Sequence, residues 1–130
     1  MDDTPDDIRL IRRILEAPPP TGEHKPKYVV REAYNGAEGI AAVHEATPDL
    51  IILDLMMPQV DGFAVVEALK AGPTTREIPI IVVTAKVLTE EDHQRLNGHI
   101  QALLAKGIFS EQELMDQVAL ALAKALAQRV

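Results

Sequence analysis

The chain has 130 residues, 47% of them hydrophobic, and this length suits one compact domain over residues 1–130 rather than two. The formal net charge of −7 argues against nucleic acid or an anionic membrane as the main partner, because both favour clustered lysine and arginine. Cysteine is absent, which excludes disulfides and thiolate chemistry. No apolar run approaches the roughly 20 residues of a membrane helix and no signal-peptide pattern is visible, so a cytoplasmic protein is expected.

The first predicted helix starts at Thr4, has Pro5 in its first turn, and carries apolar residues at helical spacing up to Leu15. Residues 17–27 contain most of the nearby prolines, so a tether or a displayed loop is expected there. The predicted elements that follow are a strand at 28–34, a helix at 36–46, a strand at 50–54, a helix at 62–71, a strand at 79–84, a helix at 89–98, a strand at 100–106, and a helix at 110–128.

Three of these strands are short, continuous apolar runs, which is typical of strands buried on both faces. Strands that alternate with helices imply parallel strands joined by crossovers, and therefore a layered α/β sheet. Two helix starts carry capping pairs, Thr89 with Asp92 and Ser110 with Glu113.

Each buried run ends in one polar residue, namely Asp54, Thr84 or Lys106. In an open parallel sheet the ligand crevice lies at the carboxyl ends of the strands, so these side chains are expected to meet there. The pair Asp2 and Asp3, just before the first helix, is expected at the same edge. Converging carboxylates suit a hard cation such as Mg²⁺, and a lysine with a hydroxyl suits the oxygens of a phosphoryl group.

Each of these residues also has a purely structural interpretation. Asp54 could be a turn or capping residue. Asp2 and Asp3 could interact favourably with the dipole of the helix that follows them. Thr84 is β-branched and could simply end a strand, and Lys106 could be a surface lysine.

Four features stand out in the sequence: the segment LIILDLMMPQVDG, the segment VVTA, the lysine after ALLA, and the acidic pair DD near the start. With them the chain resembles the receiver domain of two-component response regulators. The likeness runs from Asp2 to the last helix. It implies a flavodoxin-like (CheY-like), doubly wound parallel sheet with strand order 2-1-3-4-5. It also implies Mg²⁺-dependent transfer of a phosphoryl group to Asp54 from a sensor histidine kinase or a phosphotransfer protein, followed by self-catalysed dephosphorylation.

The same resemblance implies a role for each site residue. Asp2, Asp3 and Asp54 would hold the metal together with the backbone carbonyl of Met56. Thr84 would bond a phosphoryl oxygen and act as the switch residue. The ammonium group of Lys106 would pair with the phosphoryl charge.

The sequence departs from this family at three places. Gly107 stands where a proline usually follows the lysine, and Leu103 stands where an aromatic switch residue is common. The family's first strand, an apolar run ending in the acidic pair, is missing, and Met1 stands where its last residue would be. We therefore expect an N-terminally truncated domain with weaker metal binding than is usual in the family.

Loss of a central strand would leave two sheet edges unpaired. Three outcomes are open: a marginally stable truncated domain, movement of residues 28–34 into the vacant place beside residues 50–54, or a homodimer formed through the open edge or by exchange of elements. We hypothesise one of the latter two.

Two other functions compete with phosphotransfer. The chain could be an interaction or assembly module without phosphotransfer activity, which the missing strand and Gly107 favour. A haloacid-dehalogenase-like phosphatase is less consistent with the sequence, because Met56 occupies the place of its second aspartate.

The four histidines show no metal-ligand spacing and are expected at the surface; they are His24, His44, His93 and His99. The last helix has more apolar positions than one stripe needs, so burial against a partner is an alternative to packing on the sheet alone.

Overall fold

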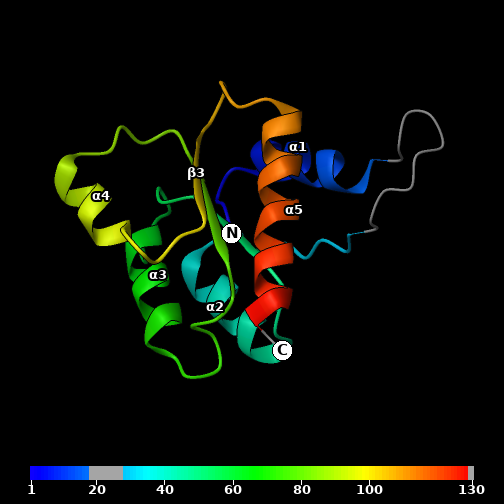
Figure 1. Cartoon of the computed structure of the whole chain (residues 1–130). Coiled ribbons are helices and arrows are strands. Elements are labelled where there is room, and N and C mark those ends of the chain that lie inside the picture. Colours follow the sequence, from blue (N-terminus) through cyan, green and yellow to red (C-terminus); the bar gives the residue numbers. More distant parts are fainter. Residues whose placement is uncertain (18–27, 129–130) are drawn as a thin grey trace.

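The computed structural model describes residues 1–17 and 28–128 (Figure 1). Within them lie five helices and three strands. In chain order these are α1 (Pro5–Glu16), α2 (Gly36–Glu45), β1 (Ile51–Leu53), α3 (Gly62–Ala71), β2 (Ile80–Thr84), α4 (Glu90–Leu96), β3 (Ala102–Ala105) and α5 (Glu111–Gln128). The five predicted helices are therefore confirmed, with ends that shift by one or two residues.

The strands form one parallel sheet in the order β1-β2-β3. All five residues of β2 are buried, as expected for a strand with neighbours on both edges. β3 lies at an edge, and its residues alternate between half-buried and exposed, so the prediction that it is buried on both faces is wrong. The α/β fold and the parallel sheet are confirmed, and β1, β2 and β3 correspond to the last three strands of the expected order.

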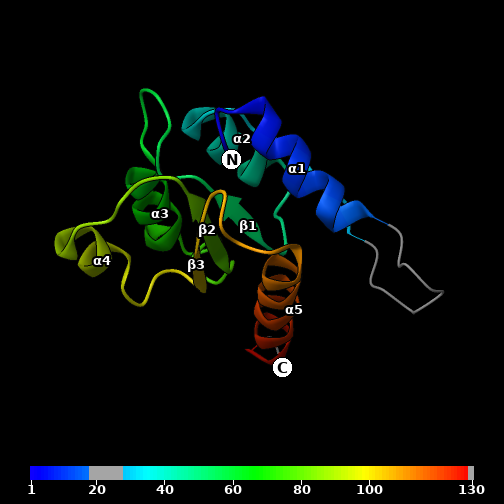
Figure 2. The same ribbon diagram turned by 90° about the horizontal axis from the view of Figure 1, so that it is seen from above.

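Helices cover both faces of the sheet (Figure 2). α2, α3 and α4 lie on one face, where Val65, Val66 and Leu69 of α3 pack against β1 and β2. α1 and α5 contact one another on the opposite face. One stripe of α5 is buried there, at Leu114, Val118, Ala121 and Ala125. This stripe supports packing on the sheet, although Leu120 and Leu126 on the same helix are exposed.

Residues 28–33 do not form a strand, which corrects the prediction for 28–34. They carry Val29 and Val30, β-branched residues typical of strands, but among the described elements no strand pairs with them to form a ladder. They also do not move beside β1, because β1 pairs with β2 alone among the described strands. That expected rearrangement is therefore wrong, and a homodimer stays a prediction.

The helix starts follow the predicted capping pairs. Thr89 and Asp92 form a reciprocal capping box. Ser110 and Glu113 do the same at the start of α5, with Glu113 N–H donating to Ser110 Oγ over 3.0 Å. Thr4 precedes α1 as predicted, but its hydroxyl makes no capping hydrogen bond.

Several surface predictions can be compared with the structure. His44, His93 and His99 are exposed as expected, whereas His24 and all of the predicted loop after Ala17 lie outside the described residues. Ile108 is 81% exposed, while Phe109 packs against the α1 and α5 side of the core. None of the helices in the described part of the chain is long and apolar enough to span a membrane.

Candidate acidic site at the carboxyl ends of the strands

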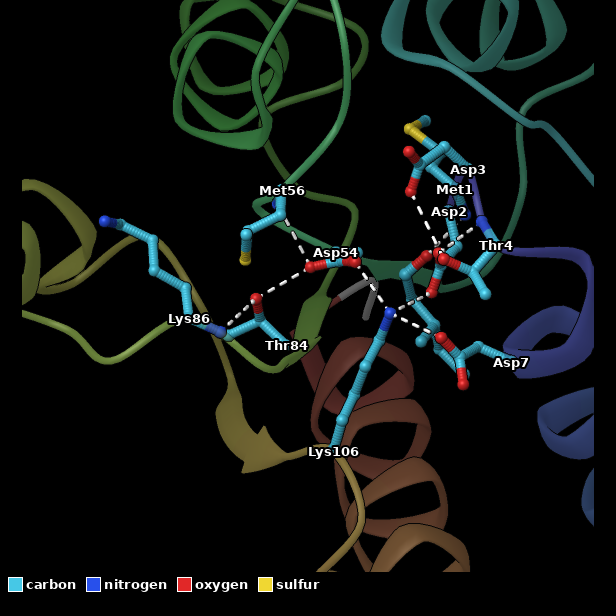
Figure 3. Close-up of polar contacts among 11 residues, drawn as sticks. Met1, Asp2, Asp3, Thr4, Asp7, Asp54, Met56, Thr84, Lys86 and Lys106 are labelled. Atoms are coloured by element: carbon cyan, nitrogen blue, oxygen red, sulfur yellow. Dashed lines mark hydrogen bonds and ion pairs between the residues drawn. The ribbon is translucent and has the colours of Figure 1, made fainter.

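Asp54 directly follows β1 and lies at the centre of the candidate site (Figure 3). Its side chain is 3% exposed. The Thr84 hydroxyl at the end of β2 donates to Asp54 Oδ1 over 2.7 Å, and the backbone N–H of Met56 donates to the same oxygen over 3.0 Å. The predicted meeting of Asp54 with Thr84 therefore occurs.

The loop after Asp54 is shaped by the segment Asp61-Gly62. The Asp61 carboxylate caps α3 by accepting from the backbone N–H of Ala64 over 2.8 Å. Gly62 lies so close to the preceding turn that a Cβ there would be 2.4 Å from Leu55 Cα and 2.6 Å from the carbonyl oxygen of Asp54. Only glycine fits at this position without displacing the backbone that carries Asp54.

Lys106 follows β3 and reaches back across the sheet edge to three carboxylates (Figure 3). Its Nζ lies 2.7 Å from Asp54 Oδ2, 2.7 Å from Asp7 Oδ2 and 3.0 Å from Asp2 Oδ2. Burial alone would lower the pKa of Lys106, but the hydrogen bonds to Asp54, Asp7 and Asp2 outweigh it and raise the pKa well above 10.5. The ammonium is therefore fully charged at neutral pH, and it neutralises part of a dense group of acids.

Asp7 is a site residue that the sequence did not single out. It lies in the first turn of α1, four residues after Asp3, and its side chain is about one-third exposed. The sequence signal available was its place in the first turn of the helix that directly follows the acidic pair.

Gly107 gives the loop after Lys106 a shape that proline cannot adopt. Its φ is +83°, whereas the ring of proline holds φ near −65°. A Cβ at Gly107 would meet nothing within 4 Å, so the left-handed backbone rather than crowding explains the glycine. Lys106 still reaches Asp54, so this departure from the family pattern does not break the contact.

The acidic pair is held where a preceding strand would deliver it. The backbone N–H of Asp2 donates to the carbonyl of Ala33, and Asp2 Oδ1 accepts from the backbone N–H of Thr4 over 2.9 Å. Asp2 therefore contacts the start of α1 and also belongs to the candidate site. Burial raises the pKa of the Asp2 carboxyl above 3.8, and the bonds from Thr4 and Lys106 oppose the rise.

The donor set fits a hard divalent cation. Asp2, Asp3 and Asp54 each offer one carboxylate oxygen, and the three oxygens lie within 4.8 Å of one another. Asp2 and Asp54 are buried while Asp3 is exposed, so the set opens to solvent on one side. Mg²⁺ commonly takes a few carboxylate oxygens and keeps several waters, and this arrangement allows for both.

Two other backbone groups shape the site. Met56 approaches Asp54 through its N–H, and its side chain is 54% exposed while Met57 is buried in the core. Lys86 donates its backbone N–H to Thr84 Oγ1 over 3.2 Å. The Lys86 ammonium points away from Asp54 and pairs with Asp92 at 3.6 Å (Figure 3).

The buried amino group of Met1 makes the stability of this chain depend on pH. Burial lowers the pKa of the Met1 ammonium from 8.0 to about 6, against the attraction of Asp2 and Asp54. Between these pH values the amino group is protonated in the unfolded chain and not in the folded chain. Its contribution to the free energy of unfolding is therefore fully present above pH 8 and is lost as pH falls towards 6. With a shift of about 2 units this loss amounts to about 3 kcal/mol.

Urea unfolding at pH 6.0 and 8.5 in the presence of a chelator tests this expectation. The matched control is the chain acetylated at Met1, which keeps an N–H donor but has no titrating amine. The acetylated chain should lack this part of the pH dependence. Equal pH dependence of the two chains would show that the Met1 amino group does not carry the effect.

Comparison with known proteins gives a consistent result. Residues 1–119 match the family described as the response regulator receiver domain. The chain is 45% identical over 80 residues to response regulator PleD of Caulobacter vibrioides, covering 62% of this chain and 17% of PleD. It is 31% identical over 101 residues to the polar-differentiation response regulator DivK of Brucella anthropi, covering 78% of this chain and 76% of DivK.

A solved structure shares the fold over almost the whole chain. The signal receiver domain of a signal transduction histidine kinase from Syntrophus aciditrophicus superposes with a TM-score of 0.75 at 29% identity, covering 95% of this chain and 87% of that one. Several curated relatives are much longer proteins, and the chain spans 17% of PleD and 37% of the transcriptional regulator RpaA of Synechocystis.

Proposed function

We propose, from the premise that the chain belongs to the family of response regulator receiver domains, that Asp54 accepts a phosphoryl group. The chain is a receiver domain of two-component signalling, and the donor proposed here is the phosphohistidine of a sensor histidine kinase or of a phosphotransfer protein. The observation that carries the proposal is the convergence of Thr84 and Lys106 on the two carboxylate oxygens of Asp54, each at 2.7 Å. A cytoplasmic location fits this role and is part of the proposal.

The chemistry follows from this arrangement. An oxygen of the Asp54 carboxylate attacks phosphorus, the bond from phosphorus to the donor nitrogen breaks, and an acyl phosphate forms. In the unphosphorylated chain the Thr84 hydroxyl donates a hydrogen bond to Asp54. After the transfer it would donate to a phosphoryl oxygen instead. The Lys106 ammonium would turn towards another phosphoryl oxygen and balance its charge. Attack of water on phosphorus then breaks the bond to Asp54 and restores the carboxylate.

A divalent cation is part of the proposal. Asp2, Asp3, Asp54 and the backbone carbonyl of Met56 would hold it, in line with the three converging carboxylates. Bound Mg²⁺ supplies positive charge that offsets the negative charge of the transferring group.

Signal output is proposed to depend on Thr84 without an aromatic partner. Leu103 of β3 stands in the place of the aromatic residue, and its side chain lies 37% exposed at the sheet edge. Movement of the Thr84 hydroxyl would instead be relayed through its contact with the Lys86 backbone, which leads into the loop before α4.

Intact mass measured after incubation with acetyl phosphate and Mg²⁺ tests the proposal. We expect one phosphoryl adduct on the chain, none after addition of a chelator, and none on Asp54→Ala. Absence of an adduct on the unaltered chain, with the fold intact by circular dichroism, would contradict phosphotransfer. It would favour the assembly module, for which the specific observation is that three carboxylates already occupy the Lys106 ammonium.

Asp7 is expected to slow the reaction with small phosphodonors. Its carboxylate lies 2.7 Å from Lys106 Nζ, so it competes with the phosphoryl group for the ammonium and repels the incoming anion. Removal of one such charge is worth about 1 kcal/mol near water, so Asp7→Asn should accelerate phosphorylation by acetyl phosphate about fivefold at saturating Mg²⁺.

Asp6→Asn is the matched control for this prediction. It makes the same change in net charge one residue earlier, at a side chain that is 85% exposed and pairs with Arg9. Equal rates for Asp6→Asn and Asp7→Asn would show that the contact with Lys106 has no special role.

A further inference from the structure

A hollow of about 190 Å³ lies at the amino ends of β2 and β3, at the opposite end of the sheet from Asp54. Its lining comes from three segments: the passage from α3 into β2, the loop between α4 and β3, and the last turns of α5. Figure 1 shows the loop after α3 and the last turns of α5 at the lower end of the sheet. We call this site the basic hollow, after four side chains in its wall: Lys70, Arg76, His99 and Lys124.

The charge of the basic hollow is opposite to that of the chain. The chain carries 20 acidic residues against 13 lysines and arginines, for a formal net charge of −7. The wall of the hollow holds two lysines, one arginine and one histidine, and Glu77 is the one acid among its described lining residues. The composition of the chain predicts more acids than cations at such a place, so the hollow is a local region of positive potential.

Lys70 is a half-buried cation whose hydrogen bonds go to uncharged acceptors. Its Nζ donates to the carbonyl oxygens of Arg76 and Ile78, each over 3.0 Å. These two bonds hold the ammonium in place and leave one of its three N–H groups without an acceptor among the described residues. Burial lowers the pKa of Lys70 below 10.5, against the attraction of Glu77. The charge of this ammonium is therefore incompletely balanced, which favours an anion beside it.

The other basic side chains of the hollow are not held in strong ion pairs. The Arg76 guanidinium lies 3.9 Å from Glu77, and both side chains are more than half exposed, so this pair is weak. Lys124 and His99 are exposed, and neither side chain forms an ion pair or a hydrogen bond within the described part of the chain. Cations from three segments can therefore meet one ligand without the loss of a strong contact.

We propose that the basic hollow binds a phosphate group, either as the free dianion or as the head of a small phosphomonoester. A dianion balances several cations better than one carboxylate does, and its oxygens accept hydrogen bonds from ammonium and guanidinium groups. A hollow of about 190 Å³ admits a phosphate group together with a small organic group. The proposal is independent of phosphotransfer, because Asp54 lies at the other end of the sheet.

Titration of the full chain with inorganic phosphate, followed by NMR of its backbone amides, tests the proposal. A chelator is present and the ionic strength is held constant with sodium chloride. We expect saturable shifts at the amides of Arg76, Gly98 and His99 in the wall of the hollow. Amides near Lys106 report separately on the candidate acidic site. Absence of saturable shifts in the hollow would overturn the proposal, and its cations would then only balance the carboxyl ends of α3 and α5.

Lys124→Met tests the part played by the cations. Lys124 is exposed, so its replacement should leave the fold intact, and the loss of one charge near water should weaken phosphate binding about fivefold. Arg13→Met is the matched control, because it removes one positive charge from the exposed face of α1, outside the hollow. Equal weakening by the two variants would overturn the proposal, since it would indicate diffuse attraction instead of a site.

Two further anions identify the ligand. Acetate carries one charge and should bind about tenfold more weakly than inorganic phosphate, and equal binding of acetate would overturn the assignment to a phosphate group. Glycerol phosphate distinguishes the two sources of that group. Tighter binding of the ester than of the free ion would support a small phosphomonoester as the ligand, and the reverse order would support the free dianion.

Discussion

Replacing Lys106 by methionine is expected to lower the free energy of unfolding by about 3 kcal/mol at pH 7 without divalent cations. The variant would keep the aliphatic volume of the side chain but remove the ammonium. Asp54 and Asp2 are 3% and 4% exposed, and both contact Lys106 Nζ. Without that cation two buried carboxylates would face one another, and the loss of one partner from a buried group of charges costs several kilocalories.

The destabilisation of Lys106→Met should depend on pH and on Mg²⁺. Without the ammonium the folded state would bind protons more tightly than the unfolded chain does, so the deficit should shrink as pH falls from 7 towards the unfolded carboxyl pKa of about 4. Mg²⁺ that binds the same carboxylates replaces the lost positive charge, so it should restore most of the stability.

Urea unfolding over this pH range, with and without Mg²⁺ at millimolar concentration, measures both effects. Lys124→Met is the matched control. Lys124 is exposed on α5, and the same substitution there should change stability by less than about 0.5 kcal/mol. If Lys106→Met were as stable as Lys124→Met, or were not rescued by Mg²⁺, the ammonium would not be what balances these acids.

The three residues that follow β1, β2 and β3 could be predicted from the sequence for a physical reason. Asp54, Thr84 and Lys106 each follow a buried apolar run, and parallel strands bring their carboxyl ends to one edge. The sheet geometry therefore delivers these side chains without any knowledge of the loops. Asp7 was missed because it comes from a helix, and the approach of α1 to this edge is a tertiary feature.

Prediction failed where the outcome depended on a neighbour. Residues 28–34 have the composition of a strand, yet a strand needs a neighbouring backbone for its ladder. Among the residues that the structure describes, Asp2 alone offers this segment a backbone partner, at Ala33. β3 reads as apolar in the same way as β2, but its place at the sheet edge leaves Leu103 exposed. Composition indicates a preference for extended backbone, and sheet topology decides whether a ladder forms.

Gly62→Ala is expected to destabilise the fold by about 3 kcal/mol, although alanine is the better helix former by about 1 kcal/mol. Gly62 begins α3, so helix propensity alone predicts stabilisation. The new Cβ would lie 2.4 Å from Leu55 Cα and 2.6 Å from the carbonyl oxygen of Asp54, and both contacts are with backbone that cannot rotate away. Overlap of this size therefore outweighs the propensity.

Gly39→Ala separates crowding by backbone from crowding by a side chain. Gly39 is also a buried helical glycine, and its Cβ would likewise approach an atom at 2.4 Å, but that atom is Sδ of Met1. A flexible thioether can change rotamer, so this variant should stay within about 1 kcal/mol of the unaltered chain. Chemical denaturation of both variants gives the comparison. Equal destabilisation would mean that the close packing of Gly62 against the Asp54 loop is relieved as easily as a side-chain contact, and that the loop is not rigidly held.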